Sequence, residues 1–136
     1  MAKLIVRTEA DLKKLAGEMV TQWSRGDLVL LDGDLGVGKT TFVRGALEAL
    51  GVVEPVRSPT FNLIQIFETE PPVMHADFYR VKGAAGTGLE DYLETHLCFI
   101  EWAANAHDLL DGLPHWSIRL DFHPEGRVVQ VIPPTN

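Results

Sequence analysis

Two stretches of the chain carry apolar residues at the spacing of a helix. The first follows Thr8-Glu9-Ala10-Asp11, in which Thr8 is expected to cap the helix and the Asp11 carboxylate stands in its first turn. The second ends at Gly51, a residue type typical of helix C-termini. Both stretches therefore predict helices with one apolar face. Their apolar positions are Leu12, Leu15, Ala16, Met19, Val20 and Trp23 in the first and Val43, Ala46, Leu47 and Leu50 in the second.

Short apolar runs before, between and after these helices predict strands. The run 28–31 is apolar throughout, as expected for a strand that is covered on both faces. Strands are also expected at 4–6, 61–68, 73–77 and 98–102, with a hairpin at 116–122 and 127–132 and further helices at 89–97 and 103–110. This alternation predicts an α/β fold whose central sheet is parallel with antiparallel additions, in a single domain spanning 1–136.

The segment that joins the strand at 28–31 to the second helix has the pattern Gly-x-x-x-x-Gly-Lys-Thr. Such a P-loop turns backbone N–H groups toward phosphate oxygens, while Lys39 can reach the β- and γ-phosphates and the Thr40 hydroxyl can ligate Mg²⁺. The alternative is a glycine-rich turn with an unrelated lysine, but the strand before it and the helix after it favour a three-layer fold like that of P-loop NTPases. The expected cofactors are ATP and Mg²⁺. The expected nucleotide-binding residues are Gly33, Asp34, Leu35, Gly36, Val37, Gly38, Lys39, Thr40 and Thr41.

Two acids end predicted strands and are candidates to complete this site. Asp77 follows the run 73–76, and Glu101 follows 98–100. The carboxyl ends of parallel strands share one edge of a sheet, so both acids are expected on the rim that carries the P-loop, where they can hold Mg²⁺ or orient a water. The alternatives are an aspartate that caps a turn and a solvated glutamate. Trp102 can stack on a group at this rim, although a tryptophan beside a strand end is more often part of the core.

A loop between the second helix and the Asp77 strand contains Ser58-Pro59-Thr60. In switch proteins with a P-loop, a loop at this place supplies a hydroxyl that senses the γ-phosphate. Ser58 and Thr60 are therefore candidate switch residues, and the alternative is a turn in which a hydroxyl caps a helix.

Composition and charge limit the class of protein, its cellular location and its binding of nucleic acid. The 136 residues are 46% hydrophobic and 23% charged, an ordinary globular composition, and no apolar run approaches the roughly 18 residues of a membrane span. The single cysteine, Cys98, lies among apolar neighbours and is expected in the core. The N-terminal apolar stretch is too short for a signal peptide, which predicts a cytoplasmic protein. The net charge of −7 argues against strong direct binding of nucleic acid, so a partner protein is expected to hold any nucleic acid.

Several motifs occur in one order along the chain: the P-loop, Ser58-Pro59-Thr60-Phe61, His75-Ala76-Asp77-Phe78-Tyr79-Arg80 and Ile100-Glu101-Trp102. In these motifs and their order, the chain closely resembles the bacterial TsaE (YjeE) family, the small ATPase of tRNA threonylcarbamoyladenosine biosynthesis. The resemblance covers nearly the whole chain.

The resemblance implies an ATPase subunit that acts with two partner proteins of the sugar-kinase/Hsp70-like fold, which form the threonylcarbamoyl transferase and hold the tRNA. By position it implies catalytic roles for Lys39, Asp77 and Glu101 and a metal site of Thr40, Asp77 and Glu101. It also implies a switch-like loop at 58–60 and a tryptophan, Trp102, near the nucleotide. Candidates near the adenine are Thr8, Asp11 and Arg127.

The chain departs from the family pattern at two places. Ala103 stands where the family often has proline, and the small residues 83–88 replace a stretch that is usually acidic and leucine-containing.

Three other functions compete with this interpretation. A small metabolite kinase would need an arginine-bearing lid, and a GTPase would need an Asn-Lys-x-Asp segment; neither is visible in the sequence. A non-hydrolysing, nucleotide-sensing adaptor is harder to separate from an ATPase. Because no arginine finger is evident in the chain, we expect weak ATP hydrolysis alone and stimulation by partners.

Overall fold

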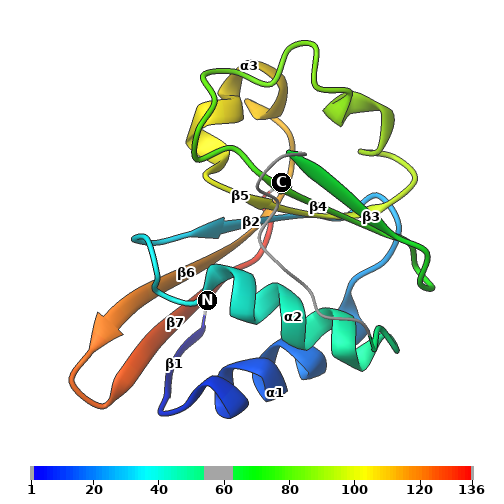
Figure 1. Ribbon diagram of the computed structural model, residues 1–136. Coiled ribbons are helices and arrows are strands. Elements are labelled where there is room, and N and C mark those ends of the chain that lie inside the picture. Colours follow the sequence, from blue (N-terminus) through cyan, green and yellow to red (C-terminus); the bar gives the residue numbers. More distant parts are fainter. Residues whose placement is uncertain (1, 54–62, 136) are drawn as a thin grey trace.

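The computed structural model describes residues 2–53 and 63–135, and in this part of the chain seven strands form one sheet (Figure 1). The order of the strands across the sheet is β1-β7-β6-β2-β5-β4-β3. Their bounds are β1 Ala2–Val6, β2 Leu28–Asp32, β3 Ile64–Phe67, β4 Val73–Asp77, β5 Leu97–Glu101, β6 Trp116–His123 and β7 Gly126–Ile132.

The directions of the strands confirm the predicted α/β fold. β2 is parallel to both β5 and β6, and β5 is parallel to β4. The outer pairs β3–β4, β6–β7 and β1–β7 are antiparallel. The carboxyl ends of β2, β5 and β4 consequently meet at one edge, where Glu101 is in register with Leu31 on one side and with Asp77 on the other.

Helices cover both faces of the sheet and make a three-layer structure. α1 (Glu9–Met19), which continues into the single turn η1 (Val20–Gln22), lies beside α2 (Lys39–Ala49) on one face. Figure 1 shows η2 (Leu89–Asp91), η3 (Ala103–Ala106) and α3 (His107–Leu110) on the other face. Each face has its own apolar cluster, so both surfaces of the central strands are buried, as their continuous apolar runs predict.

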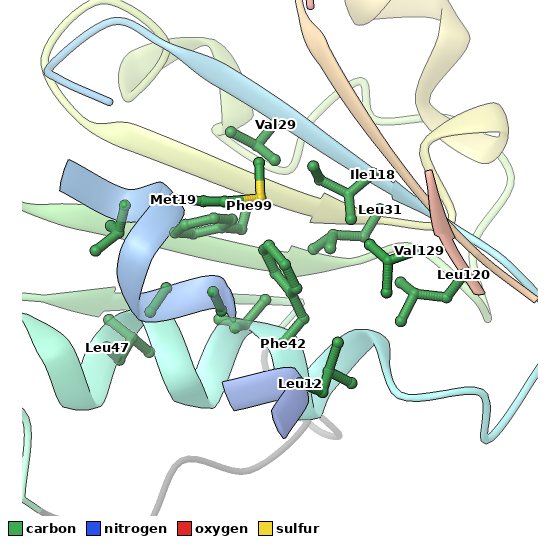
Figure 2. Close-up of a cluster of buried hydrophobic side chains, with 14 of the residues drawn as sticks. Leu12, Met19, Val29, Leu31, Phe42, Leu47, Phe99, Ile118, Leu120 and Val129 are labelled. Atoms are coloured by element: carbon green, nitrogen blue, oxygen red, sulfur yellow. The ribbon is translucent and has the colours of Figure 1, made fainter. Parts of the chain in front are cut away.

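The first apolar cluster fixes α2 against one face of the sheet, with the N-terminus of the helix near the carboxyl end of β2. Phe42 of α2 is fully buried and points toward Phe99 and Leu31 of the sheet, with Leu12 of α1 beside it (Figure 2). Burying a side chain of this size is worth roughly 1.5–3 kcal/mol, so the N-terminus of α2 has a firm position relative to β2 and β5.

The predicted helix cap of α1 is confirmed. Oγ1 of Thr8 accepts a hydrogen bond from the backbone N–H of Asp11 at 3.1 Å.

Cys98 is confirmed as a core residue: it is fully buried, and burial raises the pKa of its thiol to about 12. The reactive thiolate is therefore scarce near neutral pH, and the side chain serves packing.

Some predicted boundaries are wrong. The helix expected at 89–97 is one 3-10 turn, Leu89–Asp91, and the helix expected at 103–110 is divided into η3 and α3. Helices this short have little stability of their own, so the packing of buried residues such as Leu89 and Ala106 decides the local structure. The last strand residue before the rim is Glu101 rather than Trp102, because Trp102 turns the chain with a φ of 58°. Of the strand expected at 61–68, residues 64–67 are confirmed, and 61–62 lie outside the described residues.

Among the described helices, none has the length and apolar character required to cross a membrane.

Candidate nucleotide-binding site

The P-loop occupies the turn between β2 and α2, where two glycines are required by geometry. Gly33 has a φ of 148°, and a Cβ there would lie 2.5 Å from the carbonyl oxygen of Leu120. Gly38 has a φ of 119°, and its Cβ would lie 2.9 Å from a methyl group of Leu12. These positions allow the loop to turn tightly against the core and lead directly into α2.

The N-terminus of α2 is open toward this loop. The residue that begins the helix, Gly38, offers no side-chain cap, so the first-turn N–H groups of α2 are not used by a capping side chain. Helix N-termini of this kind bind anions, because free N–H groups and the helix dipole act in the same direction.

Lys39 is almost completely buried at the floor of the site. Its Nζ donates a hydrogen bond to the carbonyl oxygen of Gly33 at 2.6 Å and lies 3.8 Å from the ring centroid of Trp102. Burial lowers the pKa of Lys39, while the neighbouring carboxylates, Glu101 first, act in the opposite direction. A buried ammonium of this kind gains strongly from an anionic ligand, because the ligand restores the electrostatic stabilisation lost with water.

Thr40 and Glu101 are joined although they lie on different elements. The Thr40 hydroxyl is 2.9 Å and 3.1 Å from the two carboxylate oxygens of Glu101 and donates to them. Glu101 is only 3% exposed, and its Oε2 also lies 2.6 Å from Nε2 of the fully buried His75. The structure thus brings together three polar groups from α2, β5 and β4 at one point of the rim.

Asp77 stands beside this cluster at the end of β4. It is the register partner of Glu101, and its Oδ1 accepts a hydrogen bond from the backbone N–H of Tyr79 at 3.0 Å. Because β5 lies between β2 and β4, Glu101 rather than Asp77 ends the strand next to the P-loop strand.

Trp102 lines the phosphate pocket and also packs against the second apolar cluster. Its backbone adopts a left-handed conformation, which non-glycine residues use rarely and which recurs at active sites. The indole ring lies 4.8 Å from the ring of Tyr79, centroid to centroid, and covers the ammonium of Lys39.

These residues line a pocket of about 260 Å³ at the carboxyl edge of the sheet. Its lining residues are Leu35, Gly36, Gly38, Lys39, Thr40, Thr41, Asp77, Glu101 and Trp102.

A second pocket of about 230 Å³ adjoins the first and shares Gly36, Gly38 and Thr41 with it. Thr8 and Arg127, two of the candidates for adenine binding, line this second pocket, and Nε of Arg127 donates to the carbonyl oxygen of Val37 at 3.0 Å. The third candidate, Asp11, is not among the described residues that line it. Asp11 is exposed, and its backbone N–H donates a hydrogen bond to Oγ1 of Thr8. Ser58 and Thr60, the candidate switch residues, lie outside the described residues.

The oxygen atoms of the site suit Mg²⁺. Within residues 2–53 and 63–135, no group of three or more His, Cys, Asp or Glu side chains is arranged to hold a metal ion alone. The Thr40 hydroxyl and the Glu101 carboxylate are adjacent hard oxygen donors, and Mg²⁺ in nucleotide sites is held by one or two carboxylates together with phosphate oxygens and waters. The residues present therefore fit a metal ion that arrives with a nucleotide.

Sequence reasoning missed the contact between His75 and Glu101. The sequence contains part of the information needed to predict this contact. His75 and Asp77 are two residues apart on one strand, so their side chains point to the same face of the sheet. The register between β4 and β5, which brings that face to Glu101, is not visible in the sequence.

A glycine-rich loop between a parallel strand and a helix, with a buried lysine, a threonine and an acid from the next strand, defines a P-loop nucleotide-binding protein of the α/β class. Comparison with known proteins gives a particular family. The family model described as "Threonylcarbamoyl adenosine biosynthesis protein TsaE" matches residues 6–129, and the chain belongs to this family.

Individual relatives agree with this assignment. The tRNA threonylcarbamoyladenosine biosynthesis protein TsaE of Bacillus subtilis is 38% identical over 98 residues, which cover 70% of this chain and 60% of the relative. The protein of the same name from Rickettsia felis is 38% identical over 112 residues, 79% of this chain and 66% of the relative. The one from Haemophilus influenzae is 34% identical, covering 80% of this chain and 72% of the relative. The chain thus spans less than two thirds of the length of the first two relatives.

A solved structure supports the fold over nearly the whole chain. The crystal structure of Bacillus subtilis YdiB superposes with a TM-score of 0.85 at 28% sequence identity, covering 99% of this chain and 86% of that one.

Proposed function

We propose that this chain binds ATP with Mg²⁺ in the P-loop pocket and hydrolyses it in support of the threonylcarbamoyl modification of tRNA adenosine in the cytoplasm. Membership of the TsaE family supports the pathway. The observation that carries the chemistry is the contact between the Thr40 hydroxyl and the Glu101 carboxylate at the mouth of the P-loop. Together with Lys39, these groups form the phosphate and metal contacts that ATP hydrolysis requires.

The P-loop and the first turn of α2 hold the phosphates in this proposal. Backbone N–H groups of residues 36–41 donate to phosphate oxygens, and Lys39 exchanges the Gly33 carbonyl for the β- and γ-phosphates. The exchange is favourable because a charge-assisted hydrogen bond to phosphate is roughly twice as strong as a neutral one.

Thr40 and Glu101 would hold Mg²⁺, since the Thr40 hydroxyl and the Glu101 carboxylate are in contact, and Asp77 adds a second acid in register with Glu101. The metal ion, when bound, neutralises charge on the β- and γ-phosphate oxygens. Glu101 and Asp77 also orient the water that attacks the γ-phosphate, and Lys39 stabilises the negative charge of the transition state. Trp102 shields the Lys39 ammonium from bulk water.

The second pocket supplies the place for adenosine. It continues from the P-loop past Thr41 toward Thr8 and Arg127, so a nucleotide whose phosphates lie on Lys39 can extend its base into it. Arg127 already lies with its guanidinium 4.5 Å from the ring centroid of Phe122, a planar surface that a base can extend. Asp11 supports this pocket from outside, because its backbone N–H donates to the Thr8 hydroxyl oxygen that caps α1.

Partner proteins complete the activity. Among the described residues that line the phosphate pocket, Lys39 is the one cation, whereas fast P-loop NTPases use a second cation worth about 10³–10⁵ in rate. We therefore propose weak hydrolysis by the chain alone and stimulation by two partners of the sugar-kinase/Hsp70-like fold. The net charge of −7 supports contact with tRNA through those partners.

Single-turnover hydrolysis of ATP tests this function. With the chain in excess over radiolabelled ATP and Mg²⁺, phosphate release is expected to be slow alone and faster by at least about tenfold when the purified partner pair is added. ATP that stays intact in both conditions while still binding would contradict hydrolysis. That result would favour a nucleotide-sensing adaptor, which the same binding geometry allows.

A further inference from the structure

His75 is a polar residue in an otherwise apolar strand, and the chemistry proposed above gives it no direct contact with nucleotide or metal. Its neighbours along β4, from Val73 to Ala76, are fully buried and apolar. His75 itself is fully buried, and its Nδ1 has no hydrogen-bond partner among the described residues. An unpaired polar atom in the core costs roughly 1–3 kcal/mol, so packing alone would favour an apolar side chain at this position.

The other ring nitrogen has a strong partner. Nε2 lies 2.6 Å from Oε2 of Glu101, and because a carboxylate oxygen accepts, Nε2 is the nitrogen that carries the proton. The contact is diagonal across the parallel pair β4–β5: Glu101 is in register with Asp77, and His75 is in register with Phe99. Both side chains point to the face of the sheet that α2 covers, since Val73 and Phe99 belong to the apolar cluster beneath α2.

Two donors therefore fix the plane of one carboxylate. The terminal torsion of a glutamate side chain has no sharp rotamer, so the carboxylate of an isolated Glu turns easily. In this site the Thr40 hydroxyl donates from one side and the His75 imidazole from the other, both within 3.1 Å. Without the imidazole, the Thr40 hydroxyl is the single side-chain donor that the described residues give to Glu101.

We propose that His75 is a positioning residue that holds the Glu101 carboxylate in the orientation in which it and the Thr40 hydroxyl receive Mg²⁺. This inference rests on the proposed function, because it concerns the same metal position. Groups that hydrogen-bond to metal ligands typically change metal affinity by about 10–100-fold when they are removed. His75 acts only by orienting Glu101, and it does not contact the nucleotide.

Binding of a non-hydrolysable ATP analogue tests the proposal by calorimetry, in Mg²⁺ and in EDTA. His75→Leu is expected to weaken the apparent affinity for Mg²⁺ by about 10–100-fold, while affinity in EDTA stays within about twofold of the wild type. His75→Gln keeps an N–H donor near the place of Nε2 and is expected to recover most of the loss. Phe99→Leu is the matched control: it damages the same buried layer and lowers the melting temperature, but it leaves the Mg²⁺ dependence unchanged.

A double variant separates this inference from the proposed function. If His75 acts through Glu101, His75→Leu added to Glu101→Gln causes no further loss of Mg²⁺ affinity. Additive losses of Mg²⁺ affinity would overturn the positioning role. It would also be overturned if His75→Leu kept the wild-type Mg²⁺ dependence while Glu101→Gln lost it. If Glu101→Gln itself leaves the Mg²⁺ dependence unchanged, the metal site of the proposed function is overturned, and His75 loses its role with it.

A measurement on the wild-type protein covers the case in which His75→Leu does not fold. The imidazole N–H proton bonded to Glu101 is observed by NMR and assigned from its loss in His75→Gln. It is expected to shift when Mg²⁺ and the ATP analogue are added and to stay in place when the analogue is added with EDTA. A resonance that does not respond to Mg²⁺ would overturn the proposal.

Discussion

Replacing Lys39 with alanine is expected to weaken ATP binding by at least about 100-fold. The ammonium is buried beneath the P-loop and is the one cation among the described residues of the phosphate pocket. Its loss leaves phosphate charge without a charge-assisted donor, which is costly. Calorimetry with an ATP analogue and Mg²⁺ measures the effect.

The fold is expected to survive this substitution. Burial lowers the pKa of Lys39, which means that the charged form is less favourable in the ligand-free folded chain than in the unfolded one. The melting temperature without nucleotide should therefore stay close to that of the wild type. Lys13→Ala is the matched control, since Lys13 forms a partly exposed ion pair with Glu48 and neither residue lines the two pockets, so its ATP affinity should not change. Similar affinities for wild type and Lys39→Ala would refute the role of Lys39.

Replacing Glu101 with glutamine is expected to lower single-turnover hydrolysis by about 100-fold or more while the chain still binds nucleotide. Glutamine preserves the volume and can accept the hydrogen bond from Thr40, but it removes the negative charge that holds Mg²⁺ and orients water. Rapid-quench measurement of phosphate release, with the partner pair present, gives the rate. Nucleotide affinity in EDTA should remain near the wild-type value, because the phosphate contacts to Lys39 and the loop amides are intact.

Asp77→Asn, compared with Glu101→Gln, identifies which of the two acids is the more important for holding Mg²⁺. Asp77 stands next to Glu101 in register, but the Thr40 hydroxyl donates to Glu101. We therefore expect a smaller loss of hydrolysis for Asp77→Asn than for Glu101→Gln. A larger loss for Asp77→Asn would assign the metal to the end of β4 and contradict the role given to Glu101.

The local parts of the site were predictable from sequence. The glycines, lysine and threonine of the P-loop are contiguous, and the strand before them and the helix after them are marked by apolar periodicity. The cap at Thr8, the hairpin of β6 and β7 and the positions of Asp77 and Glu101 at strand ends also follow from neighbouring residues. Each of these features depends on interactions over a few residues.

The contacts within the site were not predictable in the same way. Thr40 and Glu101 are separated by 61 residues, and their contact depends on β5 rather than β4 lying next to β2. Strand order is decided by how the crossover segments pack, which no local pattern records. The same holds for the contact of His75 with Glu101 and for the left-handed conformation of Trp102, which closes over Lys39.

The measurement that tests the account most directly is a crystal structure of this chain with Mg²⁺ and a non-hydrolysable ATP analogue. We predict density for the β- and γ-phosphates against Lys39 Nζ and the N–H groups of residues 36–41, with the metal ion between the phosphates, Thr40 Oγ1 and Glu101. Density for the analogue at another place on the chain, with the P-loop empty, would contradict the account.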